Sequence, residues 1–435
     1  MIYKEILDGD KTIICTEKCD IFLCDGSGKQ AEKLINEESF EILPYSPVTP
    51  KKLKKLIILL STACNLRCRY CYLSYGKHPG EAVIQNINVE NVKKALNLII
   101  EKYPEGIEFI QFFGGEPLMA FKEMQEIYEY LGMFFESKGL LRPALGVVTN
   151  GLRINDEVID FFNRSNMAVT VSIDGDKSVH DNVRKKISKG SAYTELVEIV
   201  MRYKDKITFP LFYEMTLNRE HILNYQKGSM RNWLESIKKV GFTRGIIGVV
   251  EYSMDPSLNF REEDIPIIEE IYKEYVEYYF EELSKEETTF YNLDICRIIG
   301  MIVKKDLKLY SCNTGISQLT LSTNGALYPC PKFATVDMRI GKVEDAEFDQ
   351  SEIRKIIEKD DRKMCRECWM KQMCKSYCYS LEYRKEFNRE QVPIRCIHLD
   401  NMISNVIREM IRRKNCENFS SIVKKAMTVL AMQKV

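Results

Sequence analysis

The sequence predicts an α/β fold: an open, partial (β/α)6 barrel followed by a small cysteine-rich domain. From Leu56 to Leu283, apolar strand-like runs alternate six times with amphipathic stretches, and successive βα units predict a parallel sheet with helices outside it. Six strands are too few for a closed eight-stranded barrel, so we expect an open one. The alternation stops near Cys296, and seven of the 15 cysteines follow from Cys312 to Cys396.

A chain of 435 residues can hold two or three domains with a sizeable core. The N-terminal extension contains short β-like runs, a helix-like stretch near Gln30 to Ile35, and a linker from Pro44 to Lys55 that is rich in proline and lysine. We place the domain boundaries as follows: extension 1–55, partial barrel 56–290, cysteine-rich domain 300–400 and helical tail 401–435.

Periodicity places the individual elements. Helices are indicated where apolar residues recur every three or four positions, and strands by short apolar runs between them. The expected strands are Leu56–Ser61, Ile107–Phe113, Leu145–Thr149, Ala168–Ile173, Phe209–Leu217 and Gly245–Glu251. The expected helices are Val89–Lys102, Glu123–Lys138, Asp156–Ser165, Tyr193–Lys204, Met230–Val240 and Ile267–Leu283. Beyond the barrel, Leu319–Tyr328 predicts a hairpin, because Asn324-Gly325 suits a tight turn.

Composition excludes several classes of function. Basic and acidic residues both number 63, which argues against a nucleic-acid partner. The longest apolar runs, such as Leu56–Leu60, are far too short to span a membrane, and the N-terminus lacks the apolar region of a signal peptide. We therefore expect a cytoplasmic protein without a membrane partner. Reducing compartments disfavour disulfides, so metal or cluster binding is the expected use of so many cysteines.

Three cysteines follow the first predicted strand of the barrel. Cys64, Cys68 and Cys71 stand at the carboxyl end of Leu56–Ser61, the edge where parallel sheets gather their chemistry. Three thiolates leave a zinc site incomplete, unless a further ligand joins them. They can instead hold three irons of a [4Fe–4S] cluster and leave the fourth iron open.

This run, with Tyr70 before its last cysteine, resembles the radical S-adenosylmethionine (SAM) enzymes. The resemblance implies that a [4Fe–4S] cluster binds Cys64, Cys68 and Cys71, and that SAM chelates the fourth iron. It implies that one electron from the cluster cleaves SAM to a 5′-deoxyadenosyl radical, which abstracts hydrogen from an unactivated carbon. A flavodoxin or ferredoxin is then the expected electron donor.

Later strand ends carry matching motifs: Gly114-Gly115-Glu116-Pro117, Thr149-Asn150-Gly151, Ser172-Ile173-Asp174-Gly175 and the stretch from His180 to Arg184. Each alone is also ordinary turn chemistry or a surface charge. Glycines let a backbone approach a ligand closely. The resemblance implies that Glu116 receives the SAM amino group or orients its loop, and that Tyr70 packs near adenine. The implied SAM-binding residues are Tyr70, Gly114, Gly115, Glu116, Asn150, Ser172, Asp174 and Arg184.

The later cysteines resemble a SPASM domain, a C-terminal extension with two auxiliary [4Fe–4S] clusters, which makes three clusters in all. A pair of zinc ribbons is the alternative, since CxxC spacings suit zinc as well. The resemblance implies a distal cluster held by Cys365, Cys368, Cys374 and Cys396. It implies a proximal cluster held by Cys312, Cys330 and Cys378.

The proximal set is one cysteine short of some relatives, which carry a further cysteine where this chain has Asp306 to Lys308. Either Cys296 supplies the fourth ligand, or one iron is open to a substrate thiolate. An open iron is expected of maturases that form thioether crosslinks in ribosomally made peptides. In sulfatase maturases that resemble this chain, an aspartate base follows the cysteine that matches Cys330; here Pro331 follows it.

The predicted function is therefore thioether formation in a precursor peptide that carries a leader. Alternatives are another radical SAM reaction on a peptide, such as C–C crosslinking or sulfatase maturation, and a zinc- or cluster-containing binding protein without turnover. Glu214 and Glu251, near strand ends, are candidate bases. The extension either grips the leader as an added β-strand or caps the barrel. Within it, Cys15, Cys19 and Cys24 are buried apolar residues or metal ligands.

Overall fold

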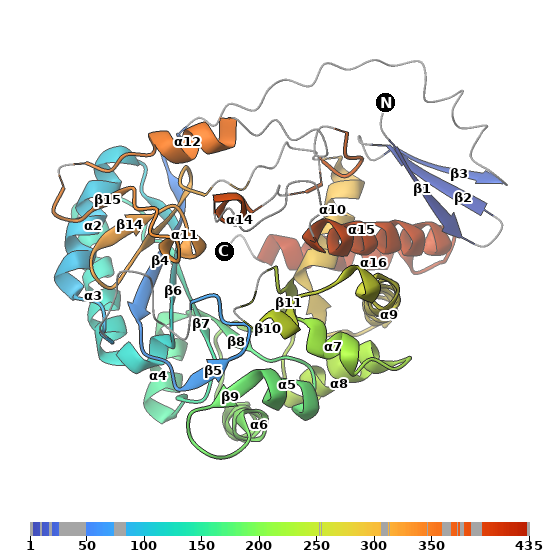
Figure 1. The fold of residues 1–435 in the computed structure, drawn as a ribbon, viewed down its shortest axis with the longest axis horizontal. Helices are drawn as coiled ribbons and strands as arrows, with labels where there is room; N and C mark the ends of the chain where they lie inside the picture. The colour runs from blue at the N-terminus through green and yellow to red at the C-terminus, as the bar shows by residue number, and fades with distance from the viewer. Residues whose placement is uncertain are drawn as a thin grey trace.

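A computed structural model shows the barrel, the cysteine-rich region and the N-terminal extension together (Figure 1). The predicted helix near Gln30 to Ile35, residues 44–48 of the predicted linker, Cys19 and Cys365 lie outside the residues that the structure describes. The described residues are 3–8, 11–16, 20–25, 49–73, 84–251, 253, 255–305, 312, 314–345, 347–358, 367–371, 373–374, 378–383 and 394–432.

Six parallel strands form the centre of the fold and confirm the predicted partial barrel. They are adjacent in the order β11-β10-β8-β7-β6-β4. Because all six run the same way, their carboxyl ends lie at one edge of the sheet. Their bounds are β4 Leu53–Ser61, β6 Ile107–Gly114, β7 Ala144–Thr149, β8 Ala168–Ser172, β10 Leu211–Leu217 and β11 Arg244–Val249.

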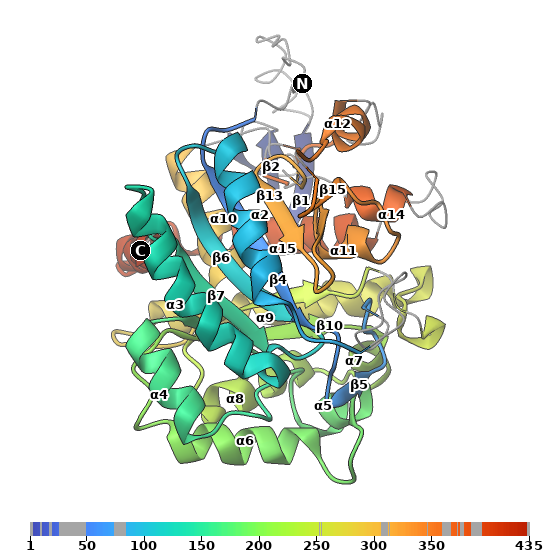
Figure 2. The ribbon, with the colours of Figure 1, turned by 90° about the vertical axis from the view of Figure 1, so that its left-hand side faces the viewer.

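The predicted helices cover the outer face of this sheet (Figure 2). Asn88, Asn155 and Ser191 cap three of them, each accepting a hydrogen bond from a backbone N–H of the first turn. Apolar residues on their inner faces, such as Leu96 and Phe162, are fully buried. The helices are α2 Val89–Lys102, α3 Phe121–Ser137, α4 Asp156–Ser165, α6 Ala192–Tyr203, α8 Ser229–Val240 and α9 Ile265–Ser284, with the shorter α5 Lys177–Val183 and α7 Arg219–Leu223.

The predicted hairpin is confirmed, and it continues the sheet of the barrel. β13 (Gln318–Leu321) pairs antiparallel with β14 (Ala326–Tyr328), and Gly325 in the turn has a φ of +82°. β13 also pairs in parallel with β4, and β15 (Gly341–Lys342) pairs with β14. With β12 (Tyr291–Asn292) beside β11, these strands and the six of the barrel make one ten-stranded sheet.

The C-terminal tail is helical, as predicted, and it packs against the barrel as two helices. α15 (Ile394–Arg413) lies along α9, and α16 (Phe419–Met432) lies along α9 and α10 (Leu293–Lys304). Helix α10 was not expected from the sequence. Short helices α11 (Pro331–Ala334), α12 (Ser351–Glu358) and α14 (Tyr379–Tyr383) complete the cysteine-rich region. Of the helices described, none is long and apolar enough to cross a membrane.

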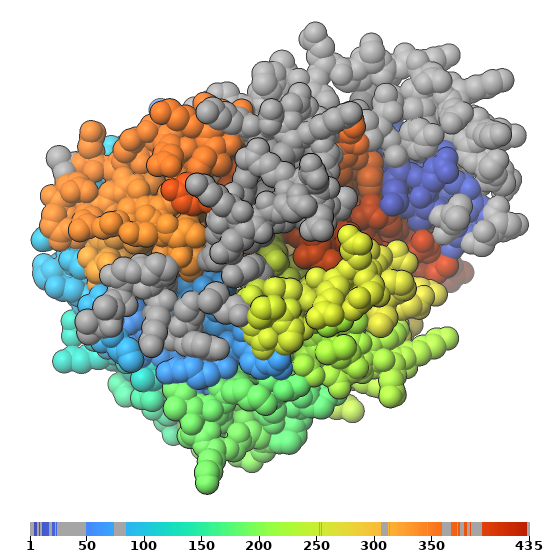
Figure 3. All heavy atoms as spheres, viewed as in Figure 1, coloured from blue at the N-terminus to red at the C-terminus, as the bar shows by residue number. Residues whose placement is uncertain are grey.

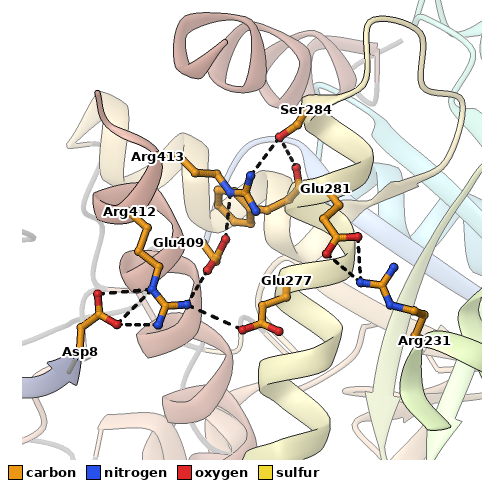
Figure 4. Close-up of polar contacts among 9 residues, drawn as sticks. Asp8, Arg231, Glu277, Glu281, Ser284, Glu409, Arg412 and Arg413 are labelled. Carbon is orange, nitrogen blue, oxygen red and sulfur yellow. Dashed lines mark hydrogen bonds and ion pairs between the residues drawn. The ribbon is translucent and has the colours of Figure 1, made fainter. Parts of the chain in front are cut away.

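The N-terminal extension forms a three-stranded antiparallel sheet that lies against α15 (Figure 1). Its strands are β1 Tyr3–Asp8, β2 Lys11–Thr16 and β3 Ile21–Asp25. Ile6, Ile13 and Cys15 join the main apolar core, so Cys15 is a buried residue of this sheet. Two ion pairs hold β1 to α15: Lys4 with Asp400 at 3.0 Å, and Asp8 with Arg412 at 2.6 Å (Figure 4).

Candidate active site

The predicted motifs meet at the carboxyl edge of the parallel strands. Cys64 follows β4, Glu116 follows β6, Asn150 follows β7 and Asp174 follows β8. A short antiparallel pair, β5 (Leu66–Cys68) and β9 (Arg184–Lys186), then joins the cysteine loop to the segment after β8. Figure 3 shows the blue segment around β5 and the orange cysteine-rich region on one face of the molecule.

The first cysteine group consists of Cys64, Cys68 and Cys71. Burial, with the neighbouring thiol of Cys71 as a smaller cause, raises the pKa of Cys64 to about 11 and that of Cys68 to about 12. The three side chains are therefore close together, and Cys64 and Cys68 are neutral near pH 7 until a metal takes the place of their protons. Three neighbouring soft donors fit the ligand set of an iron–sulfur cluster. Among the described residues, no three Cys, His, Asp or Glu side chains surround the position of a single ion.

Asp174 organises the residues that face this group. Its carboxylate accepts hydrogen bonds from Tyr70 Oη at 2.5 Å, from Arg184 Nε at 2.8 Å and from the Thr216 backbone N–H at 2.9 Å. Burial alone would raise the pKa of Asp174, but the Arg184 guanidinium outweighs it and keeps the carboxyl ionised. Arg184 also lies 5.3 Å from the centre of the Tyr70 ring. Asp174 therefore holds Arg184 and Tyr70 in place.

The two glycines at the end of β6, Gly114 and Gly115, dock tightly on the segment that leads to Cys64. The Gly115 N–H donates to the Ser61 carbonyl at 2.7 Å, and the Glu116 N–H donates to the Ala63 carbonyl at 2.8 Å. A β-carbon on Gly115 would lie 2.3 Å from the Ala63 oxygen, so no other residue fits without displacing that backbone. Gly114 has a φ of +137°, which also favours glycine. These contacts fix the start of the cysteine loop.

Glu116 links the ends of two strands. It is 1% exposed, and its carboxylate accepts from Thr149 Oγ1 at 2.6 Å and from the backbone N–H groups of Asn150 at 2.8 Å and Leu118 at 3.0 Å. Burial raises the pKa of Glu116, and these hydrogen bonds oppose the rise. The Asn150 amide in turn donates to Asn65 Oδ1 at 2.7 Å, beside Cys64. Of the two roles expected for Glu116, the orientation of its loop is the one these bonds perform.

Ser172 and Glu214 face each other across β8 and β10, where they are partners in the strand register. Glu214 is half-buried, and burial raises its pKa while Arg184 and Lys55 oppose the rise. Burial also lowers the pKa of Lys55, and Glu214 opposes this change. The Lys55 ammonium lies 5.7 Å from the Phe109 ring centre. Glu214 is thus a carboxylate with a raised pKa near Arg184 and Lys55, and a raised pKa suits a proton acceptor.

A second cysteine group consists of Cys312, Cys330 and Cys378. Burial, with the neighbouring thiols of Cys378 and Cys312 as smaller causes, raises the pKa of Cys330 to about 12. The predicted proximal set is therefore close together. In the predicted distal set, Cys368 and Cys396 pack against the main core, and Trp369 donates to Asp400 at 2.7 Å.

Tyr72 was not singled out from the sequence, although it directly follows the last cysteine of the first group. Burial raises its pKa well above the usual value, and Cys330, Cys71, Glu214 and Cys378 raise it further. Each of these groups must be near the phenol to act on it. Tyr72 therefore lies near thiols of both cysteine groups and near Glu214.

Two further charged residues join the cysteine segments to the barrel. Arg69, inside the first cysteine loop, donates from Nε to Asp255 at 2.8 Å and from Nη2 to Ser257 at 2.9 Å. Glu251, the other candidate base, pairs with Lys332 and Arg395. These two cations make Glu251 a poor proton acceptor.

A cavity of about 410 Å³ lies away from all of these residues, at the amino-terminal ends of β10 and β11. It contains none of the residues predicted to bind SAM or metal. Its lining includes Lys204, Phe209, Leu211 and Arg244.

Comparison with known proteins agrees with this arrangement. Residues 58–224 match the model of the Radical SAM superfamily. A radical SAM cyclopropyl synthase, TigE, from Paramaledivibacter caminithermalis is 25% identical over 30% of this chain and 29% of its own length. A cysteine-type anaerobic sulfatase-maturating enzyme from Clostridium novyi is 27% identical over 35% and 42%. The chain thus aligns with less than half of each of these two relatives.

Longer matches share the fold. The cysteine-type anaerobic sulfatase-maturating enzyme of Clostridium perfringens strain 13 is 22% identical over 77% of this chain and 90% of its own length. The structure of native anSMEcpe with bound AdoMet and the Cp18Cys peptide is similar with a TM-score of 0.66 and 17% identity, over 85% of this chain and 99% of that one. Streptococcus suis SuiB bound to precursor peptide SuiA gives a TM-score of 0.52 and 13% identity, over 90% and 97%.

Proposed function

We propose that this chain is a radical SAM peptide maturase that joins a cysteine sulfur of a ribosomally made precursor peptide to a carbon of another residue. The observation that carries the proposal is the second group of three thiols, Cys312, Cys330 and Cys378, with Tyr72 beside both it and the first group. Such a pair of sites could bring a peptide thiolate and a reactive carbon together.

Bound clusters and SAM would supply hydrogen-atom removal from carbon and would take up the electron released when the C–S bond forms. Cys64, Cys68 and Cys71 would hold the cluster of the SAM site, and the predicted distal set would hold another. Around the proposed SAM site, Asp174 holds Arg184 by an ion pair, and the Glu116 carboxylate holds the end of β6 to the end of β7. Their work is to orient SAM and to exclude water.

The second group favours thioether formation because three thiols would leave one position for a peptide thiolate. Cys296, the alternative fourth ligand, is buried in the main core on α10. Its thiol lies near the phenols of Tyr275 and Tyr291 and contributes to raising the pKa of both. That placement supports an open position rather than ligation by Cys296.

Glu214 is the better candidate for receiving the thiol proton. It lies near Tyr72 and has a raised pKa caused first by burial. In the proposed reaction the carbon loses a hydrogen atom to the SAM-derived fragment, the peptide thiol loses its proton to Glu214, and the remaining electron goes to an auxiliary cluster.

The N-terminal sheet is proposed to bind the leader of the precursor by adding it as a further β-strand. The sheet has its own ion pairs to α15, Lys4 with Asp400 and Asp8 with Arg412. The similar protein SuiB has been seen with a precursor peptide. A low-potential flavodoxin or ferredoxin is the proposed electron donor.

Anaerobic reconstitution tests the proposal. We expect a brown protein with about twelve irons per chain, which with reductant and SAM releases 5′-deoxyadenosine and removes two hydrogen atoms from the peptide. Cys68→Ala should abolish SAM cleavage, Cys374→Ala should retain some cleavage but lose product, and Cys416→Ala, at an exposed cysteine, should behave as wild type. A colourless protein that binds zinc and leaves SAM intact would instead indicate a binding protein without turnover.

Sulfatase-type maturation is the second candidate, favoured by the long match to the enzyme from Clostridium perfringens. That reaction oxidises a side chain without forming a crosslink. Pro331, which follows Cys330, offers no proton acceptor at the position where the sequence resemblance places one. Incubation with a sulfatase-derived cysteine peptide separates the two, because an aldehyde product reacts with hydrazine and a thioether does not.

A further inference from the structure

Glu251 lies where the barrel meets the cysteine-rich region. It comes two residues after the end of β11, at the edge of the sheet where the other functional residues gather, and its side chain is 6% exposed. Its carboxylate is shared by two cations: Arg395 Nη1 donates to Oε1 at 2.6 Å, and Lys332 Nζ donates to Oε2. A carboxylate so deeply buried is expected to have partners of this kind.

The two cations come from segments that carry predicted metal ligands. Lys332, on α11, is two residues from Cys330 and 81 residues from Glu251. Arg395, on α15, directly precedes Cys396 and is 144 residues from Glu251. A single carboxylate of the barrel therefore holds one segment from each of the two predicted ligand sets.

The same cations also face the thiols. Burial would raise the pKa of Glu251, but Lys332 and Arg395 outweigh it and hold the pKa at about 2. Cys378 raises the pKa of both Lys332 and Arg395, and Cys374 raises the pKa of Arg395. Lys332 and Arg395 therefore stand between a negative carboxylate and the second cysteine group, so a change at Glu251 alters the net charge beside these cysteines.

We propose that Glu251 is a positioning residue that fixes Cys330 and Cys396 above the carboxyl edge of the barrel and offsets the positive charge of Lys332 and Arg395 beside the cysteines. The inference rests on the proposed function, since it concerns clusters bound at those cysteines. The reduction potential of an iron–sulfur cluster depends on the net charge near it. Removing the carboxylate charge should therefore make an auxiliary cluster easier to reduce.

The test compares charge variants of the iron-loaded, full-length protein in redox titrations followed by electron paramagnetic resonance. Glu251→Gln should shift the potential of one auxiliary cluster upward, and Lys332→Gln should shift it downward, because the two changes alter the charge in opposite directions. Glu251→Asp keeps the charge and should restore a potential close to that of wild type. If Glu251→Gln does not fold, the downward shift in Lys332→Gln still tests the proposal.

Glu282 provides a matched control. Its side chain is 2% exposed and pairs with Lys238 at 2.9 Å and with Lys285, so it too is a buried carboxylate between two cations. It joins α8 and α9, however, and not a cysteine segment. Glu282→Gln should lower the melting temperature as Glu251→Gln does, but it should leave every potential unchanged.

Two further measurements do not depend on the potentials. In the iron-free chain, hydrogen exchange of residues 331–334 and 394–400 should be faster in Glu251→Gln than in wild type, and unchanged in Glu282→Gln. In the loaded enzyme, the ratio of product to 5′-deoxyadenosine should fall in Glu251→Gln while SAM cleavage continues. This pattern is expected of misplaced auxiliary cysteines next to an intact SAM site.

The inference is overturned if the Glu251 and Lys332 variants shift the potential in the same direction or not at all, and if exchange in both segments matches wild type. Failure of the proposed function is visible separately, in the wild-type protein. If wild type binds only about four irons per chain, the auxiliary clusters are absent, and the inference falls together with them.

Discussion

Asp174 and Arg184 form a buried ion pair in which Asp174 Oδ2 lies 2.8 Å from Arg184 Nε, with side chains 0% and 7% exposed. Because Tyr70 shares the carboxylate, Asp174 fixes two of the residues that we expect to contact SAM, Tyr70 and Arg184. An isolated guanidinium in such a place would be strongly disfavoured.

Asp174→Asn should therefore weaken both the fold and the SAM site. Removing one member of a buried pair costs about 3–5 kcal/mol of unfolding free energy, and SAM affinity should fall about tenfold or more as Arg184 and Tyr70 lose their position. Urea unfolding and calorimetric titration with SAM measure the two effects. Asp176→Asn, at a partly exposed helix cap where asparagine caps as well as aspartate, is the control. Unchanged SAM affinity in Asp174→Asn would contradict the assignment.

Gly115→Ala should damage the cysteine loop, because the added methyl group would lie 2.3 Å from the Ala63 oxygen. We expect loss of iron from the first cysteine group and a drop in SAM cleavage of about a hundredfold or more. Gly132→Ala in α3, where the nearest side-chain atom is 3.4 Å away, should be neutral or slightly stabilising. Iron analysis and 5′-deoxyadenosine release would show equal behaviour of the two variants if the close contact did not matter.

The first cysteine group should react slowly with alkylating agents in the iron-free chain. Burial raises the pKa of Cys64 to about 11 and that of Cys68 to about 12, so few of these thiols are ionised near neutral pH. Their alkylation by iodoacetamide should keep rising with pH beyond pH 9, as the reactive thiolate forms. Exposed Cys416 is the internal reference. Mass spectrometry of peptides measures each site, and faster alkylation of Cys64 or Cys68 than of Cys416 at pH 8 would refute this expectation.

Arg412 should hold the N-terminal sheet in place. It pairs with Asp8 at 2.6 Å, Glu409 at 3.1 Å and Glu277 at 3.7 Å, and so joins β1, α15 and α9 (Figure 4). Since the arginine is partly exposed, Arg412→Ala should cost only about 1 kcal/mol of global stability. Hydrogen exchange in residues 3–8 should nevertheless become faster.

Arg231→Ala is the matched control for Arg412→Ala. Arg231 is similarly exposed and pairs with Glu281 at 2.8 Å, but it links α8 to α9 and does not touch the N-terminal sheet (Figure 4). Its loss should leave exchange in residues 3–8 unchanged. Equal effects of the two variants on that segment would show that the arginine network does not anchor the sheet.

The local elements of the barrel were predictable because their periodicity is strong. Helices at Val89–Lys102 and Asp156–Ser165 have the predicted bounds, and the predicted hairpin turn at Asn324-Gly325 is confirmed. Spacing and strand context were likewise enough to place Cys64, Cys68 and Cys71 at a strand end. In each case the deciding signal lies within about twenty residues of sequence.

Long-range relationships were not predictable in this way. The pairing of β13 with β4 joins residues such as Leu319 and Leu56, which are far apart in sequence, and no local pattern encodes such a partner. The sequence indicated Glu251 as a candidate base at a strand end. It could not show the two cationic partners of Glu251, because they lie 81 and 144 residues away. No sequence motif distinguishes Tyr72, and only the fold brings it near both cysteine groups.

The parallel pairing of β4 with β13 joins the strands that lead to the two cysteine groups. A hinge between them would have to break backbone hydrogen bonds in the middle of a ten-stranded sheet. The pairing holds β4, which leads to Cys64, and the hairpin that leads to Cys330 in one continuous sheet. In the proposed reaction a peptide would bind between these two cysteine segments, so the spacing of its own residues would select which atoms meet.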